Sequence, residues 1–264
     1  MDYMFKEVHD IISVEMKSDK NCQITSMISV FENCESFYNF TLIGFGADNL
    51  KSMQKLFYKS WLNQYSFTSF NTLALEDISY MFASTYIENF NLKGINTNRV
   101  TEMSHLLDDC SSLEYADFTG FDTSSVKDMS YMFHSCTAIK ELDLSGFKTG
   151  EVVNMSNMFQ ECISLTELNI KSFDTSKVED MSFMFDSNIA LENLDLSSFV
   201  TTNLKNMSSM FLYCDGLEYI DVKNFDTRNV VNTSGLFASS KHLLEVDISN
   251  FVLSNNKDMS KMFF

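Results

Sequence analysis

A nearly identical string of eight residues recurs along this chain at a fixed interval. It reads MSYMFHSC at 129–136, MSNMFQEC at 155–162, MSFMFDSN at 181–188 and MSSMFLYC at 207–214. Each copy begins 26 residues after the previous one. A period of this length is typical of stacked-repeat proteins, in which every repeat forms one coil of an elongated solenoid.

The repeat can be followed from one end of the chain to the other. If the first residue of the string is coil position 1, the coils begin at Met1, Met27, Met53, Ile78, Met103, Met129, Met155, Met181, Met207, Thr233 and Met259. The intervals that begin at Met53 and Ile78 are 25 residues, and the others are 26. We therefore expect one solenoid domain over 1–264, of about ten coils, degenerate over 1–102 and regular over 103–264.

Several coil positions are apolar in nearly every coil and predict the core. In the regular coils, position 5 is Phe with one Leu, position 11 is Leu or Ile, and position 19 is always Phe. These columns, together with the methionines at positions 1 and 4, account for much of the unusual content of 25 Phe and 17 Met. One coil cannot bury such a face alone, so the columns predict a core that runs along the stack.

Within a coil, two kinds of local pattern follow one another. The segment LTELNIKSF (165–173) alternates apolar and polar residues, which predicts a strand with positions 14 and 16 inward and position 15 outward. The segment DMSFMF (180–185) places Asp before two Met at i and i+3, which predicts an N-capped helical turn. The expected fold is an α/β repeat, with one short helical turn and one short parallel strand per 26-residue coil. Repeated from coil to coil, these strands should give a parallel sheet on one side of the solenoid.

Two further columns hold small polar residues. Position 8 carries five of the six cysteines: Cys34, Cys110, Cys136, Cys162 and Cys214. Neighbouring thiols would lie within disulfide range, but Thr85 and Asn188 share the column, which favours small buried side chains. Position 21 carries a threonine column, for which an exposed array that orders water is a minor alternative: Thr123, Thr149, Thr175, Thr201 and Thr227.

Charge limits the classes of partner. The chain has 19 Lys and Arg against 36 Asp and Glu, a net charge of −17. Such a surface is repelled by phosphate backbones and anionic lipid, so we expect no nucleic-acid partner. The chain has no run of about 20 apolar residues, so we expect no membrane insertion. A basic protein or a cation is the favoured partner.

The acidic residues gather at the outward strand positions. Position 15 is Asp in five of the six regular coils, and positions 12 and 13 add glutamates and two tyrosines. The predicted binding residues are Glu114, Tyr115, Asp117, Glu141, Asp143, Glu167, Asp195, Tyr219, Asp221 and Asp247. One interpretation is a solvated face that prevents edge-to-edge pairing. The other is a pre-aligned acidic surface for a basic protein or for calcium, and both remain open.

Residues for catalysis are not aligned in the repeat. His9, His105, His134 and His242 occupy different coil positions, so no column joins a Ser or Cys nucleophile to a His and a carboxylate. Glycine-rich phosphate loops are missing, with only eight Gly in the chain. We expect a non-enzymatic protein with no cofactor and no metal. An enzyme that uses His134 is the minor alternative.

The unit MSxMFxxCxxLxxLDLSxFDTSxVxD, legible at 129–154 and 155–180, resembles the BspA-type repeat of bacterial surface proteins and mycoplasma lipoprotein-type proteins. The resemblance covers essentially the whole chain and is best over 103–264. It implies a leucine-rich-repeat-like solenoid and an adhesin-type protein that binds a partner protein at the cell surface or after secretion. Because MDYMFKEVHD at the N-terminus has no apolar h-region, a cytoplasmic interaction scaffold is the alternative.

The last residues of the chain are of the core type. The sequence stops at SKMFF, with Met262, Phe263 and Phe264 in the phase of the repeat. Solenoids shield their last core layer with polar caps. We therefore expect either a longer array or end-to-end self-association through the uncapped C-terminal coil.

Overall fold

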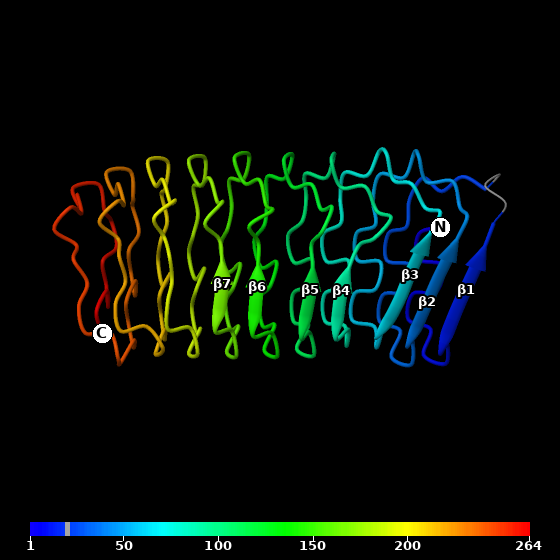
Figure 1. Ribbon diagram of the computed structural model, residues 1–264, viewed down its shortest axis with the longest axis horizontal. Coiled ribbons are helices and arrows are strands. Elements are labelled where there is room, and N and C mark those ends of the chain that lie inside the picture. Colours follow the sequence, from blue (N-terminus) through cyan, green and yellow to red (C-terminus); the bar gives the residue numbers. More distant parts are fainter. Residues whose placement is uncertain (19–21) are drawn as a thin grey trace.

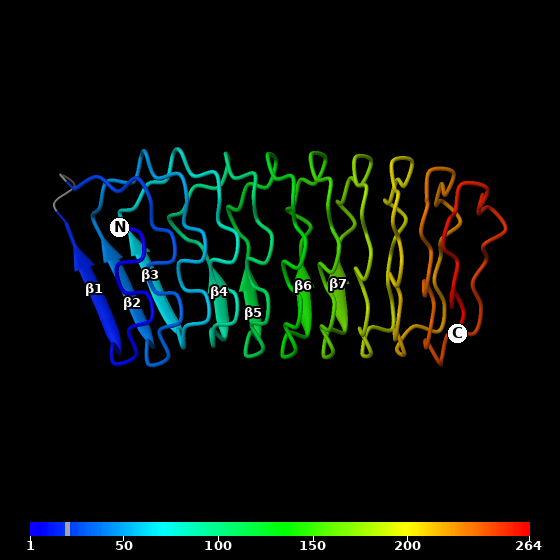
Figure 2. The same ribbon diagram turned by 180° about the vertical axis from the view of Figure 1, so that it is seen from behind.

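The chain forms a β-solenoid in which successive coils stack along one axis (Figure 1). The computed structural model describes residues 1–18 and 22–264. Parallel bridges join the residues that precede position 1 of successive coils: Ser52, Asp77, Glu102, Asp128, Asn154, Asp180, Asn206, Asn232 and Asp258. These bridges step by 25 residues twice and then by 26, which confirms the predicted period. Seen from behind, the coils follow chain order without crossing (Figure 2).

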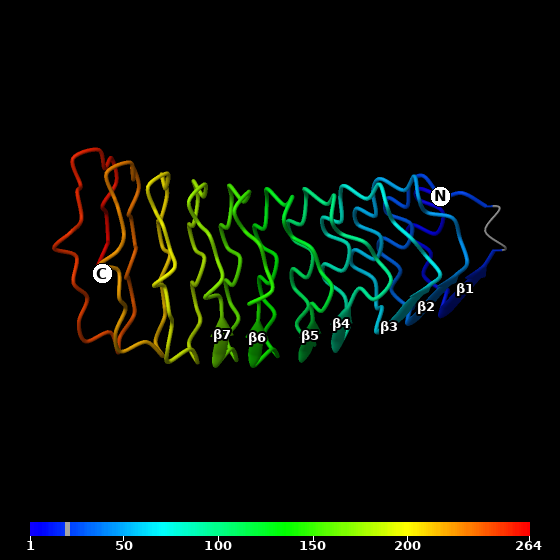
Figure 3. The same cartoon turned by 45° about the horizontal axis from the view of Figure 1, so that its top comes forward.

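The strands lie along one edge of the stack (Figure 3). In the described part of the chain they are β1 (Ser13–Lys17), β2 (Asn39–Ile43), β3 (Gln64–Thr68), β4 (Asn89–Asn91), β5 (Tyr115–Asp117), β6 (Glu141–Asp143) and β7 (Glu167–Asn169). All pairs are parallel, which confirms the predicted direction. The prediction of one strand in every coil is wrong, because the described residues after β7 contain no strand. The parallel sheet is divided into three, β1-β2-β3, β4-β5 and β6-β7.

The helical turn predicted at the repeated string is wrong, because no described residue is helical. The segment is instead a series of tight turns. The N–H of Met132 donates to the Met129 carbonyl at 3.3 Å, and the N–H of His134 donates to the Tyr131 carbonyl at 3.2 Å. The N–H of Tyr131 donates to the Ser156 carbonyl of the next coil at 3.0 Å. An α-helix keeps these N–H groups within its own segment, so the inter-coil bonds replace it.

These turns require left-handed backbone at coil positions 3 and 7. Tyr131 has φ 57° and Ser135 has φ 53°, and the same two positions are positive in the other coils. Among the described residues at these two positions, only Gly235 is a glycine. Left-handed backbone costs an L-residue roughly 1–2 kcal/mol. The hydrogen bonds to the next coil hold the chain in this conformation.

The core consists of the predicted apolar columns. Phe133, Phe159, Phe185 and Phe211 are fully buried. Their rings stack from coil to coil with centroids 5.7, 5.7 and 5.8 Å apart and planes within 10° of parallel. Stacked rings add to the gain from burial, so this column is a continuous aromatic spine.

The cysteine and threonine columns are also buried and bond between coils. The Cys162 thiol donates to the Phe133 carbonyl at 3.1 Å, and the Asn188 amide, in the same column, donates to the Phe159 carbonyl at 2.8 Å. All six thiols are free. The hydroxyl of Thr149, which is 1% exposed, donates to the Asp174 carbonyl and accepts the Asp174 N–H. The water-ordering threonine array is therefore wrong.

Candidate functional site

The ten predicted binding residues lie on one surface of the stack. We call the surface formed by coil positions 12–15 from Glu114 onward the strand face. Eight of the ten side chains are exposed, and Asp117 and Asp247 are half-buried. The register of β6 and β7 places Glu141 directly opposite Glu167.

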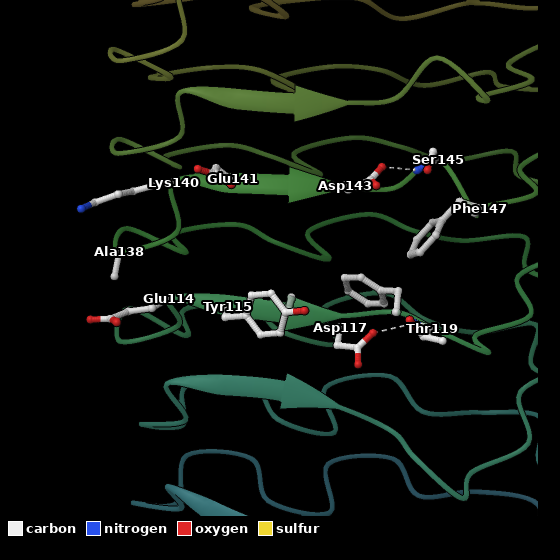
Figure 4. Close-up of a pocket in the computed structure, with 13 residues that line it drawn as sticks. Glu114, Tyr115, Asp117, Thr119, Ala138, Lys140, Glu141, Asp143, Ser145 and Phe147 are labelled. Carbon is white, nitrogen blue, oxygen red and sulfur yellow. Dashed lines mark hydrogen bonds between the residues drawn. The ribbon is translucent and has the colours of Figure 1, made fainter.

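The structure brings five of these residues together around one hollow. A hollow of about 680 Å³, which we call the Tyr115 hollow, opens between β5 and β6 (Figure 4). Glu114, Tyr115, Asp117, Glu141 and Asp143 line it, with aromatic side chains at the carboxyl ends of the strands. It lies where one sheet ends at β5 and the next begins at β6.

Two similar hollows follow along the strand face. The Tyr219 hollow, of about 700 Å³, is lined by Tyr219 and Asp221 together with Glu192, Glu218 and His242. Between the two tyrosine hollows lies a third, of about 640 Å³, lined by Glu141, Asp143, Glu167 and Asp195. Asp247 lines none of the three. Its carboxylate lies 4.0 Å from the Lys223 ammonium.

The aspartates at position 15 have a local structural role. The Asp143 carboxylate accepts the N–H of Ser145 at 3.0 Å, and the Asp195 carboxylate accepts the N–H of Ser197 at 3.0 Å. The bond from the Ser145 backbone lowers the pKa of Asp143. This is an Asx-turn, which explains why the column contains Asp or Asn.

Three lysines that the sequence analysis missed neutralise part of the aspartate column. Each lies two residues after position 15 and pairs with the Asp of the next coil: Lys93 with Asp117 at 3.7 Å, Lys171 with Asp195 at 3.6 Å and Lys223 with Asp247 at 4.0 Å. Position 17 read down the repeat would have revealed them. The aspartates are therefore only part of the acidic surface.

The glutamates at positions 12 and 13 differ from the aspartates. Among the described residues none of them has an ion-pair partner, and all are exposed: Glu114, Glu141, Glu167, Glu192, Glu218 and Glu245. Like charges placed directly opposite each other in a parallel pair, as Glu141 and Glu167 are, destabilise the fold. The local structure gives no reason for this row of carboxylates.

A second polar cluster, which the sequence analysis did not predict, lies on the turn segments. The Asp108 carboxylate is 2.7 Å from Nδ1 of His105 and 2.7 Å from Nδ1 of His134. Asp108 and His134 share coil position 6, so reading that column would have found the pair. Ser135 Oγ lies 3.3 Å from His134 Nε2 but donates to the Glu161 carboxylate at 2.8 Å. The hydroxyl proton is thus directed at a carboxylate and away from the imidazole.

Burial and charge set the ionisation of this cluster. The His105 ring is stacked between Tyr80 and Tyr131, with centroids 4.1 and 4.4 Å away. Burial favours neutral Asp108, but hydrogen bonds from the two histidines lower its pKa below the usual value. Burial likewise opposes charge on His134, but the bond to Asp108 and its negative charge raise the pKa of His134. The cluster ties one coil to the next.

Within residues 1–18 and 22–264, no three His, Cys, Asp or Glu side chains converge in a way that could hold a metal ion. The same described ranges contain no helix long and apolar enough to cross a membrane.

A family model described as "Mycoplasma protein of unknown function, DUF285" matches the chain over residues 1–116, 85–169 and 155–264. The three overlapping matches together span the whole chain, as expected for a repeat. The chain belongs to the DUF285 family. No curated protein and no solved structure matches it. The family description contains no activity, so the function must be argued from the strand face.

Proposed function

We propose that this DUF285 chain is a non-enzymatic, protein-binding solenoid of the BspA-like, leucine-rich-repeat-like type. Its strand face engages a basic segment of a partner protein. The observation that carries the proposal is the row of six exposed glutamates without cationic partners, which runs beside two exposed tyrosines and three hollows. Tyrosines beside pockets are typical anchors of protein interfaces, and a row of one charge steers an oppositely charged partner.

The alternative of a purely solvated face accounts for less. It explains exposed carboxylates, but it does not explain Tyr115 and Tyr219, which are 60% and 48% exposed beside hollows. A face that only needs to be solvated also has no need of like charges directly opposite each other, as Glu141 and Glu167 are.

Matched variants of the chain test this proposal. The partner is first captured from host or neighbouring cells by crosslinking to the wild-type chain, and its affinity is then measured by calorimetry. Glu141→Gln, Glu167→Gln and Glu218→Gln combined should weaken binding roughly tenfold and reduce its salt dependence. The control combines Glu151→Gln and Glu179→Gln, whose carboxylates pair with Lys177 and Lys205 away from the strand face. Equal affinity of the wild type and the triple variant would refute the proposal.

The resemblance to BspA-type repeats supports a place at the cell surface, as an adhesin-type protein, and an intracellular interaction scaffold is the second candidate. Protease treatment of intact source cells, followed by mass spectrometry, separates the two. Release of peptide 172–177 without lysis is expected. Protection of that peptide until lysis would favour the intracellular scaffold.

A further inference from the structure

Tyr115 and Tyr219 occupy equivalent places on the repeat, and each lies beside a hollow. Both tyrosines occupy coil position 13, and each follows a glutamate and precedes an aspartate by two residues. The same position holds Glu141, Glu167 and Asn193 in the three coils between them. The two tyrosines are therefore separated by four coils, and coil position 13 between them is acidic or polar.

Each hollow suits a cationic side chain. The exposed ring of Tyr115 forms one wall, beside the carboxylates of Glu114, Glu141 and Asp143. Lys140 also lines the hollow, and its side chain extends away from the Tyr115 ring (Figure 4). The ring of Tyr219 is placed likewise, beside several carboxylates. A guanidinium group stacks on an aromatic ring and bonds carboxylates at its edge. The shared chemistry is thus that of an arginine or lysine receptor.

The separation of the two tyrosines constrains the spacing of cations in the partner. At about 5 Å per coil, four coils place the two tyrosines roughly 20 Å apart. An extended peptide covers this distance in about six residues, and an even number of residues puts both side chains on the same side. A helix covers it in about 14 residues, or four turns, which also returns the second side chain to nearly the same side. The extended segment immobilises fewer residues on binding, which favours it over the helix.

From this geometry we infer that the strand face binds an extended basic segment whose two cationic side chains, six residues apart, stack on Tyr115 and Tyr219. This inference rests on the proposed function and names its partner class. The third hollow, with Glu141, Glu167 and Asp195, lies under the middle of the segment. Among the described residues, its unpaired glutamates are Glu141 and Glu167, because Lys171, which also lines it, pairs with Asp195.

Two synthetic peptides test the inference. Both are 12-residue chains of Ser, Thr and Gly with two arginines, placed six residues apart in one and three residues apart in the other. Binding is followed by fluorescence anisotropy at low salt. The peptide with the longer spacing should bind roughly tenfold more tightly, because only it reaches both hollows at once. Equal affinity of the two peptides, or no binding of either, would overturn the inference.

Tyrosine variants show whether the hollows cause the preference. Tyr115→Ser and Tyr219→Ser should each abolish the advantage of the longer spacing. Tyr213→Ser is the matched control, since Tyr213 is also 48% exposed but lies on the turn segment, where other coils carry serine. Thermal unfolding of each variant verifies that it is folded. A preference that survives both hollow variants, or is lost in the control, contradicts the inference.

The outcomes separate this inference from the proposed function. If the spacing has no effect but the glutamate variants weaken binding of the captured partner, the inference fails and the proposed function stands. If the glutamate variants also bind that partner as the wild type does, both fail.

Discussion

At the scale of single residues, the left-handed turn positions define the conformation of each coil. Tyrosine, serine, lysine, asparagine and acidic residues occupy most of them, and His105, Phe183 and Gly235 occupy the others. Their side chains cost conformational energy that glycine avoids. The repeat tolerates this cost because each turn is bonded to the next coil.

Because of this cost, we expect that a glycine at one of the left-handed positions stabilises the chain. Ser84, with φ 56°, is a suitable position. Ser84→Gly should raise the free energy of unfolding in urea by up to about 1 kcal/mol. Ser111→Gly is the control, because Ser111 is exposed with ordinary backbone, and it should lose about 0.5–1 kcal/mol. Equal destabilisation of both variants would contradict a conformational cost at Ser84.

The Asp108–His134 pair predicts a pH dependence of stability. The pKa of Asp108 is lowered by folding, so its contribution is present above the unfolded value of about 3.9 and is lost as pH falls through the folded pKa. The pKa of His134 is raised, so its contribution is full below about 6.5 and is lost as pH rises through the folded pKa. The pair therefore stabilises the fold most between these values.

The measurement is the free energy of unfolding of the wild type and of His134→Gln. The loss caused by this substitution should be larger at pH 5.5 than at pH 8.5, by on the order of 1 kcal/mol. His242→Gln, at an exposed histidine, serves as the control. A loss that is the same at both pH values would argue against the pair.

At the scale of structural elements, the threonine column acts as a buried clip between coils. Thr175 is fully buried, donates to the Val200 carbonyl at 2.9 Å and accepts the Val200 N–H at 2.8 Å. The same reciprocal pair recurs from Thr72 to Thr227. The column thus supplies backbone pairing where no strand exists.

Substitution of the clip tests this role. Thr175→Val keeps the shape but leaves both backbone groups of Val200 unpaired, and should cost about 2–4 kcal/mol in unfolding free energy. Thr175→Ser keeps the hydroxyl and loses one methyl, at a cost of about 1 kcal/mol. Should the valine variant prove the more stable of the two, the hydroxyl has no such role.

At the scale of the whole molecule, the net charge of −17 opposes compaction. The strand-face glutamates add to this repulsion without local compensation. A surface kept for binding is expected to cost stability in this way.

The dependence of stability on ionic strength should reveal the repulsion between the strand-face glutamates. Glu141→Gln combined with Glu167→Gln should raise the free energy of unfolding by a few tenths of a kcal/mol at low ionic strength. The gain should shrink in 0.5 M NaCl, because salt screens exposed charges. Asp143→Asn, which retains the Asx-turn, is the comparison. A double variant less stable than the wild type at low salt would count against charge repulsion on this face.

The sequence alone determined the period, the core columns and the alternation of buried and exposed strand positions. Each of these depends on which residues are apolar at a repeated spacing, and that can be read residue by residue. It also placed the ten candidate binding residues on one surface, because coils of equal length bring equal positions together.

Only the tertiary structure decided what the backbone N–H groups bond to. In the repeated string, Tyr131 and its equivalents donate to a coil 25 residues further on, so turns replaced the predicted helix. The breaks between sheets, and the hollows along the strand face, likewise depend on how neighbouring coils meet. The local sequence of the repeated string is compatible with a helix and with turns. The hydrogen bond to the neighbouring coil decides between them, and the local sequence does not reveal that bond.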